Sequence, residues 1–338
     1  MSNAREIAQL GSVPSGRKNL IINGAMVIDQ RNSGSSVALS SSVVYDTDRF
    51  LTRLGTSSSS TAQQVSDAPD GFNKSLKLTI GTGASPSAAT GDGYFGQIVE
   101  GYNSAHLNWG TSSAKTVTFS FWVKSSLTGS FGLVVANYAL NMCYPTSYTI
   151  NSANTWEHKT ITISGPTSGG FDTASGGSIY ILFDWGCGSD FKGTANSWSV
   201  SDYRGGATGT QSICATSGAT WQITGVQLEV GSVATEFEHR SYGEELALCQ
   251  RYYIKNNRWN IWSGYTVNAS NYFENAEFPT TMRTAPTVLT TYIGSAGFAV
   301  ANPTVQQQDI HGFYAYMTCN LTGGSGYFIF RYTADAEL

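Results

Sequence analysis

The fold is decided by the stretch GVQLEVGSVATEFEHR at 225–240, followed by SYGEELALCQRYY at 241–253. Its first part alternates apolar with polar residues, which is the period of a strand with one buried face. The apolar members of that alternation are Val226, Leu228 and Val230. Just upstream, Trp221 and Ile223 have the opposite parity, so we expect a β-bulge at Gly225.

The second part of the stretch predicts a helix. Ser241 is a suitable N-cap, and Glu244 completes a capping box three residues later. One stripe follows at helical spacing, made of Tyr242, Leu246, Cys249 and Tyr253. This is the one helix that the sequence predicts strongly, and it divides two long β-rich segments. We therefore expect a short linking helix over 241–253.

The segment before the helix carries many short alternating runs. Strands are expected at 76–80, 95–100, 117–123, 131–135, 148–150, 161–163 and 179–185. Such a series without intervening helices is typical of two packed antiparallel sheets. The sequence thus predicts an all-β fold with a large antiparallel β-sandwich, a jelly roll, over 19–240. Residues 1–18 form a short polar leader ahead of it.

Strand signals resume after the helix and predict a small all-β C-terminal domain over 254–338. Its apolar and aromatic residues occupy both strand parities, so a lone small sandwich would leave many of them in water. Three copies around an axis would bury both faces and cover the strand edges. We therefore expect a homotrimer.

Composition argues against several classes of function. Charged residues make up 12% of the chain and the net charge is −4. Because Lys and Arg form no cluster, nucleic-acid binding is not expected. No apolar run is long enough for a membrane span, and the N-terminus lacks the features of a signal peptide. The five cysteines fall at no metal-ligand spacing, so we expect buried thiols, and neither a metal nor a cofactor.

Several segments resemble a module of bacteriophage tail fibre proteins, in the same order along the chain. They are residues 19–31, 45–50, 65–72, 115–124, 154–157 and 225–253. The pattern at 227–235 is also similar to the strand that ends carbohydrate-binding jelly rolls, and 332–338 resembles a tail-fibre ending. Residues 254–330 match no segment of this family, and fibre tips vary because they follow the host surface.

The resemblance implies a structural protein of the virion, made in the host cytoplasm without a signal peptide. It also implies partners. The leader 1–18 would attach the chain to other phage tail or baseplate proteins. The domain at 254–338 would trimerise and bind a polysaccharide, glycan or receptor on the host surface.

Catalysis is not expected from the residues. Enzymes of phage tails degrade polysaccharide with paired carboxylates, and the candidate pairs here are Asp46 with Asp48 and Asp184 with Asp190. We interpret Asp48 instead as a partner of Arg49 or Arg53, or as the cap of a turn. The four histidines are far apart and accompany no nucleophile motif.

Sugar recognition requires aromatic faces among amides and hydroxyls. The residues predicted to bind a ligand are Trp262, Tyr314, Tyr316, Asn260, Asn268 and Asn320. Strand parity places the three aromatic residues opposite apolar neighbours such as Ile261 and Phe313, and hence toward solvent. Burial at a subunit interface is the alternative for them, and for Trp122 it is the favoured interpretation.

The leading hypothesis is a non-enzymatic, homotrimeric tail fibre whose C-terminal domain binds a host glycan. Two alternatives stay open. One is a depolymerase that cleaves such a glycan, and the other is a purely architectural protein of the virion.

Overall fold

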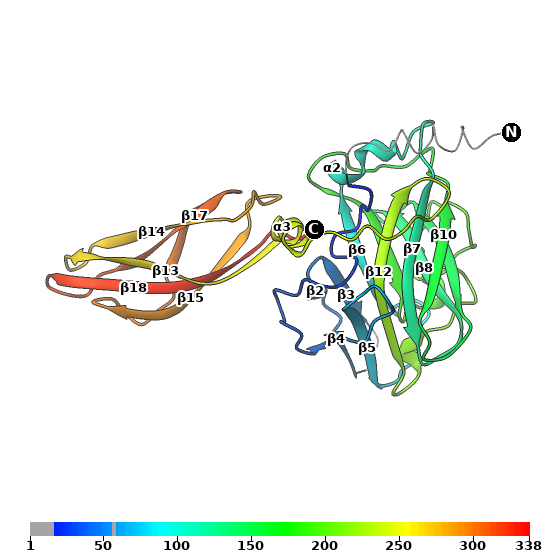
Figure 1. Ribbon diagram of the computed structural model, residues 1–338, viewed down its shortest axis with the longest axis horizontal. Helices are drawn as coiled ribbons and strands as arrows, with labels where there is room; N and C mark the ends of the chain where they lie inside the picture. Colours follow the sequence, from blue (N-terminus) through cyan, green and yellow to red (C-terminus); the bar gives the residue numbers. More distant parts are fainter. Residues whose placement is uncertain (1–16, 56–58) are drawn as a thin grey trace.

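A computed structural model of the protein describes residues 17–55 and 59–338. Figure 1 shows a large β-unit and a slender one, joined beside helix α3 (Tyr242–Gln250). Most of the leader predicted at 1–18 lies outside the described residues. The prediction of an all-β fold is confirmed, since strands dominate the regular structure of both units.

The large unit is a sandwich of two six-stranded antiparallel sheets. The first sheet has the order β1 (Val37–Ala38), β4 (Ser59–Val65), β5 (Ser75–Thr82), β12 (Thr220–Val230), β7 (Val117–Ser125) and β10 (Glu157–Ile163). The second has the order β2 (Val44–Thr47), β3 (Phe50–Leu54), β6 (Gly93–Glu100), β11 (Gly177–Asp184), β8 (Gly129–Asn137) and β9 (Cys143–Ile150).

Aromatic side chains from the two sheets meet in the core of the sandwich. The ring of Phe119 on β7 lies 5.9 Å from that of Phe183 on β11, between centroids. Trp221 on β12 lies 5.7 Å from Phe95 on β6. All four side chains are buried, so the period-2 alternation of the strands does point one face of each sheet into a shared interior.

Strand β12 lies between β5 and β7 in the first sheet. Its register with β7 shifts between Thr224 and Gln227, and Gly225 there has φ +62°. The predicted bulge is therefore confirmed. A side chain at Gly225 would lie within 3.0 Å of Phe72 and Trp122, so both the backbone angle and the space require glycine.

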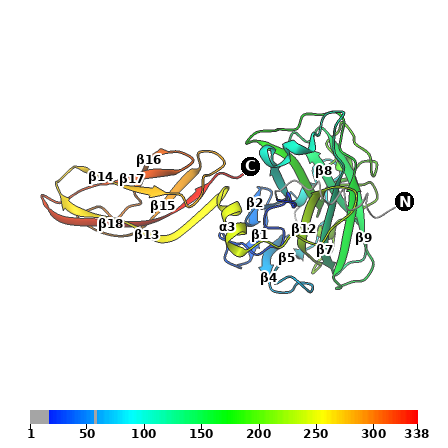
Figure 2. The same cartoon turned by 45° about the horizontal axis from the view of Figure 1, so that its top comes forward.

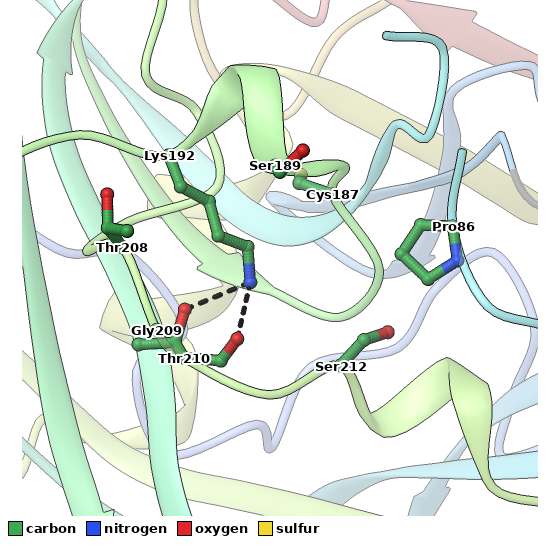
Figure 3. Close-up of a pocket in the computed structure, with 8 residues that line it drawn as sticks. All are labelled: Pro86, Cys187, Ser189, Lys192, Thr208, Gly209, Thr210 and Ser212. Atoms are coloured by element: carbon green, nitrogen blue, oxygen red, sulfur yellow. Dashed lines mark hydrogen bonds between the residues drawn. The ribbon is translucent and has the colours of Figure 1, made fainter. Parts of the chain in front are cut away.

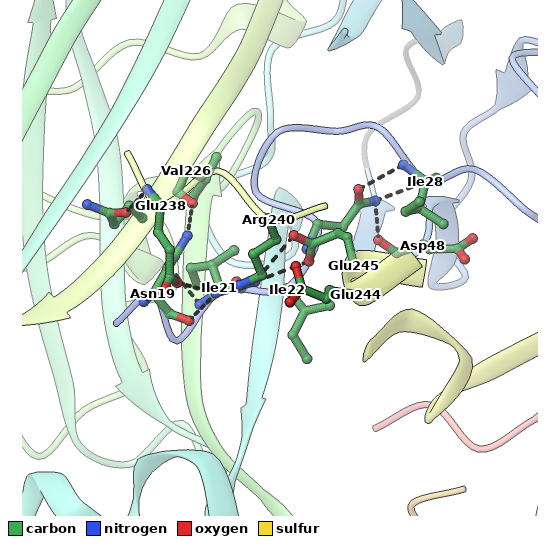
Figure 4. Close-up of polar contacts among 12 residues, drawn as sticks. Asn19, Ile21, Ile22, Ile28, Asp48, Val226, Glu238, Arg240, Glu244 and Glu245 are labelled. Carbon is green, nitrogen blue, oxygen red and sulfur yellow. Dashed lines mark hydrogen bonds and ion pairs between the residues drawn. The ribbon is translucent and has the colours of Figure 1, made fainter. Parts of the chain in front are cut away.

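The first described residues are tied to β12 and to the segment that follows it (Figure 4). The Asn19 side chain donates to the Val226 carbonyl at 3.0 Å and accepts from the Leu228 amide at 3.0 Å. Arg240 donates to the carbonyl oxygens of Asn19, at 2.6 Å, and Ile21, at 3.2 Å. Segments about 200 residues apart in sequence thus close the sandwich together.

Helix α3 begins with both hydrogen bonds of the predicted capping box, between Ser241 and Glu244. The predicted stripe is wrong at Tyr242, which is 65% exposed, and Glu245 is buried instead. The Glu245 carboxylate accepts from the Asn23 amide at 2.5 Å, so a polar contact fixes this face of the helix. Within residues 17–55 and 59–338 four shorter helices also occur: α2 (Gly101–Ser104), η1 (Ala105–Leu107), η2 (Ser189–Phe191) and η3 (Ile213–Ala215).

The C-terminal unit consists of two three-stranded sheets, which Figure 2 shows as two layers. One has the order β13 (Tyr253–Thr266), β18 (Gly324–Asp335) and β15 (Thr287–Ala296). The other has the order β14 (Asn271–Glu277), β17 (Gly312–Thr318) and β16 (Thr304–Gln308). Residues such as Phe313, Phe328 and Phe330 fill a core between the layers.

The end of β18 and the residues after it connect the two units. The Glu337 carboxylate forms ion pairs with Arg49 and Arg31 of the sandwich, and the Arg49 side chain is 1% exposed. Arg283 donates to the carbonyl oxygens of Ala336, at 2.9 Å, and of Ser175 in the sandwich, at 2.8 Å. This buried polar network fixes the direction in which the C-terminal unit points from the sandwich.

Candidate functional site

One hollow of about 250 Å³ lies on the sandwich (Figure 3). It is lined by Pro86, Cys187, Ser189, Lys192, Thr208, Gly209, Thr210 and Ser212. The Lys192 ammonium lies 2.8 Å from the Asp184 carboxylate and donates to the Thr210 carbonyl and hydroxyl at 2.8 and 3.0 Å.

Two of these contacts are hydrogen bonds that Lys192 donates, and the ion pair with Asp184 balances its charge. Burial raises the pKa of the Cys187 thiol well above its usual value, which disfavours the nucleophilic thiolate. None of the described residues that line the hollow is aromatic. Its polar groups therefore hold the loop after β11 in place and leave little with which to recognise a ligand.

The first predicted carboxylate pair is buried, with Asp46 1% and Asp48 0% exposed. Asp46 accepts from the Thr52 hydroxyl, and Asp48 accepts from the backbone and side-chain amides of Gln30 at 3.0 and 2.5 Å. Burial raises the pKa of Asp46 to about 7 and that of Asp48 to about 6. Because neither carboxyl is open to solvent, the pair offers no access to a polysaccharide.

The predicted arginine partners of Asp48 are wrong. Arg49 instead pairs with Glu337, and Arg53 pairs with Asp92 at 3.2 Å. In the second predicted carboxylate pair, Asp184 is buried against Lys192.

The outer face of the sheet β14-β17-β16 carries a different set of side chains. We call it the tyrosine–glutamine face, and it consists of Phe273, Tyr314, Tyr316, Gln306 and Gln307. Strand register brings them together: Phe273 lies opposite Tyr316, and Gln306 lies opposite Tyr314. The alternate residues of β17, among them Phe313 and Ala315, are buried in the core.

A shallow hollow of about 340 Å³ lies on this face, lined by Phe273, Gln306, Gln307 and Tyr314. Phe273 is 46% and Tyr314 is 44% exposed, and the Tyr316 ring packs against Phe273 with centroids 5.3 Å apart. Aromatic rings beside amide groups suit a pyranose, whose C–H face stacks on a ring while its hydroxyls bond to amides.

Tyr314 and Tyr316, two of the predicted residues, both lie on this face, and whether they bind a ligand stays a prediction. Asn320 is exposed beyond the end of β17, with the same parity as these tyrosines. Asn268 is exposed nearby, because the turn that contains it bonds to Cys319 through the Ala269 amide at 2.9 Å.

The predicted orientation of Trp262 is wrong. Its ring points into the core, 4.5 Å from Tyr272 and 5.9 Å from Phe328 between centroids. The opposite parity faces water, with Ile261 48% and Tyr265 72% exposed. Parity separates the two faces of β13, but it does not tell which is buried when both are apolar.

Asn260 shares the inward parity of Trp262 and donates from its side chain to the Phe330 carbonyl at 3.2 Å. It therefore lies away from the tyrosine–glutamine face. In the sandwich, Trp122 is half-buried and its ring lies 5.2 Å from His158, so it packs within its own chain.

Phe273, Gln306 and Gln307 are the members of the face that sequence reasoning missed. The signal for Phe273 was the alternation along 271–277, which places it with Asn271 and Asn275. The glutamines come from a polar run with no apolar alternation, and Gln307 has φ +51°, so a strand was not evident there.

Two further properties concern residues 17–55 and 59–338. No helix in these ranges is long and apolar enough to cross a membrane. In the same ranges, no three His, Cys, Asp or Glu side chains gather as the ligands of a metal ion would.

No protein-family model and no curated protein matches the sequence of this chain. Among solved structures, similarity is found to the enzymatically active domain of bacteriophage CBA120 tailspike protein 4, at 14% identity and a TM-score of 0.31. That match covers 63% of this chain and 21% of the tailspike chain, so the chain spans about a fifth of that structure.

Two other solved structures are matched over nearly their whole length. A CBM4 structure is 15% identical, with 62% of this chain and 98% of that chain covered and a TM-score of 0.32. A putative sugar binding protein from Bacteroides thetaiotaomicron is 10% identical, with 63% and 100% covered and a TM-score of 0.32. Scores this low establish neither a shared family nor a shared function.

Proposed function

We propose that this protein is a component of a bacteriophage tail that binds a glycan on the host surface through its tyrosine–glutamine face. The observation that carries the binding role is the pairing of Phe273 and Tyr314 with Gln306 around one shallow hollow. The tail role rests on the resemblance of 19–253 to tail fibre modules. In that role three copies act together at the virion, attached through the leader at 1–18.

The chemistry of the face favours a neutral sugar. The residues that line its hollow are aromatic or amide, and none of them carries a charge. A shallow site gives weak binding, on the order of 1 kcal/mol for each stacked ring. Several copies on one fibre raise the effective concentration and so turn weak sites into stable adsorption.

The test is binding of the intact protein to an array of bacterial surface glycans and to host cells. We expect a defined set of neutral glycans to bind, and the double variant Phe273→Ala/Tyr314→Ala to lose both activities while its melting temperature is unchanged. Tyr102→Ala is the matched control, because Tyr102 is 64% exposed on α2 of the sandwich. Equal binding by the double variant would exclude this face as the site.

The same purified protein and glycans also test the two alternative functions, a depolymerase and an architectural protein of the virion. If incubation with a bound polysaccharide releases new reducing ends, the protein is a depolymerase and the proposed function is wrong. If the protein binds neither glycan nor cell, an architectural role in the virion fits it better.

A further inference from the structure

The outer side of the sheet β14-β17-β16 continues beyond the tyrosine–glutamine face. Strand register arranges its side chains in three cross-strand rows, which together we call the strip. The first row is Asn271 and Thr318, the second is Phe273, Tyr316 and Thr304, and the third is Asn275, Tyr314 and Gln306. All of these residues are exposed except Tyr316, which is half-buried. The strip extends past the hollow, because no residue of the first row lines it.

The second and third rows repeat one arrangement of chemical groups. In the second row Thr304 lies opposite Tyr316, and in the third row Asn275 and Gln306 lie on either side of Tyr314. Each of these rows therefore combines an aromatic ring with hydroxyl or amide groups from a neighbouring strand. Residues on one face of a strand recur about every 7 Å, which is comparable with the length of one sugar residue in a polysaccharide. Consecutive rows thus suit consecutive sugars of one chain.

The first row adds hydrogen-bonding groups without a ring. The Thr318 hydroxyl donates to the side-chain oxygen of Asn271 at 2.7 Å. This bond orients the Asn271 amide, whose N–H₂ group belongs to an exposed side chain and can donate to a sugar hydroxyl. A sugar that lies beyond the hollow would meet this group.

The hollow lies within the strip and does not enclose an end of it. Phe273 of the second row and Tyr314 of the third both line it, and the first row continues on one side. On the other side, Gly312 occupies the next position on this face of β17 and presents no side chain there. Recognition of a terminal sugar requires a pocket that surrounds it, whereas this hollow is shallow and lets a chain pass over the strand.

Carboxylates lie at the Gly312 end of the strip. Glu277 is exposed and lies opposite Gly312 in the strand register. Asp309 accepts from the backbone amides of His311 and Gly312 at 2.6 and 3.1 Å, and these bonds hold the pKa of Asp309 below its usual value. Like charges repel, so an acidic polysaccharide is disfavoured at this end.

We propose that the strip binds the interior of a linear, neutral polysaccharide, with up to three consecutive sugars along β17 and no need for a chain end. The observation that carries the inference is the repeated pairing of rings with polar groups across adjacent rows. The inference rests on the proposed function, because it specifies the class of glycan that the same site takes.

The first test is calorimetric titration of the full chain with oligosaccharides of increasing length. They are prepared by partial hydrolysis of a neutral surface polysaccharide from a bacterium to which the protein adsorbs. We expect affinity to rise about fivefold from one sugar to two, since a second ring is then stacked. A smaller rise should follow with the third sugar, and affinity should then level off. An affinity that is already maximal for the monosaccharide would overturn this inference and leave glycan binding itself intact.

The second test counts the protein chains that one polysaccharide chain binds at saturation. Fractions of the same polysaccharide that differ in length are titrated with the protein. If the interior is recognised, the number of bound protein chains should grow in proportion to polysaccharide length. A number that stays the same at every length would show that a chain end is recognised and would overturn the inference.

The variant Asn271→Ala tests whether the site extends beyond the hollow. It should bind the monosaccharide as tightly as wild type and bind the longest oligosaccharide about fivefold more weakly, because one hydrogen bond is lost. Asn73→Ala is the matched control, since Asn73 is an exposed asparagine of the sandwich, and it should bind both as wild type does. Unchanged affinity of Asn271→Ala for the longest oligosaccharide would overturn the extended site. If no neutral glycan of any length binds to wild type, the proposed function fails and this inference fails with it.

Discussion

The sandwich and the C-terminal unit are both built from two packed antiparallel sheets, yet their outer faces differ in how much of the large side chains is exposed to water. In the sandwich the outer side of the second sheet is itself buried, with Leu51, Ile98 and Leu182 at most 2% exposed. In the C-terminal unit both outer faces present large side chains to water, as Tyr265 and Tyr314 show. A small unit that leaves such surface exposed on two sides is suited to contact with other molecules on both.

The two outer faces of the C-terminal unit also differ from each other. Amides accompany the aromatic rings on the tyrosine–glutamine face, whereas the exposed aliphatic side chains of Ile261 and Leu289 accompany them on the outer face of the sheet β13-β18-β15. Amide groups can form hydrogen bonds with a polar ligand, whereas aliphatic side chains favour contact with another protein surface. Within the proposed function, the difference assigns glycan recognition to the sheet β14-β17-β16.

The largest effect is expected for a variant that weakens the connection between the two units. Glu337→Gln removes the charge that faces Arg49, whose guanidinium is otherwise bonded to the Ile98 carbonyl at 2.6 Å. Leaving a buried charge without its counter-ion costs about 3–5 kcal/mol. We expect the free energy of unfolding in urea to fall by that amount.

The control for that prediction is Asp335→Asn. Asp335 pairs with Arg31 at 2.9 Å but its side chain is 41% exposed, so solvent screens the pair. The cost should stay below about 1 kcal/mol. Equal losses in the two variants would show that the Arg49–Glu337 pair has no special role in joining the units.

The second prediction compares the two sides of β13. Trp262 packs on Tyr272 and Phe328 in the core, whereas Trp259 is 59% exposed. Trp262→Ala should destabilise the C-terminal unit by about 2–3 kcal/mol, less than a fully buried ring because Trp262 is half-buried. Trp259→Ala should change the unfolding of the monomer by no more than about 0.5 kcal/mol. If Trp259→Ala destabilised the unit and Trp262→Ala did not, Trp262 would face solvent, as the sequence predicted.

The sequence predicts most of the large unit, and the reason is visible in its strands. Over residues 117–123 only one parity is apolar at every position, so the face of β7 that enters the core follows from the pattern alone. The bulge at Gly225 follows from the change of parity around it, and the capping box from Ser241 and Glu244. In each case one local pattern has one structural solution.

The C-terminal unit is less predictable because its strands are apolar on both sides. Trp262 and Ile261 are equally suitable as core residues, and only the packing against Tyr272 and Phe328 decides between them. The partners of buried charged groups are equally hard to predict from the local sequence, as the surroundings of Asp48 show. Its neighbour Arg49 pairs with Glu337, 288 residues away, which no local pattern indicates.

The third prediction concerns pH and the sandwich side of the junction. Burial raises the pKa of Asp46 to about 7 in the folded protein, from its usual value near 4. The folded state therefore holds a proton that the unfolded state has lost between these two values, so this group makes stability fall as pH rises through that window.

Asp46→Asn removes this titration while it keeps an acceptor for the Thr52 hydroxyl. The variant should be more stable than wild type at pH 8, and the difference should shrink toward zero at about pH 4. Urea unfolding of both proteins across that range measures it. Comparing the two proteins cancels Asp48, which titrates in both. A difference that does not vary with pH would contradict a raised pKa at Asp46.

The smallest expected effect tests what the tyrosine–glutamine face recognises. If the Tyr314 ring stacks on a sugar, Tyr314→Ala should weaken binding at a single site by about 1 kcal/mol, or roughly fivefold. Tyr314→Phe keeps the ring and loses only the hydroxyl, so it should bind nearly as tightly as wild type. Because the residues that line the hollow are uncharged, affinity should also change little with salt. Calorimetric titration with a monovalent sugar, at low and moderate salt, measures both quantities.

An equal loss of affinity in Tyr314→Phe and Tyr314→Ala would mean that the hydroxyl is recognised and the ring is not stacked. A steep fall of affinity with salt would mean that charged groups outside this hollow hold the ligand.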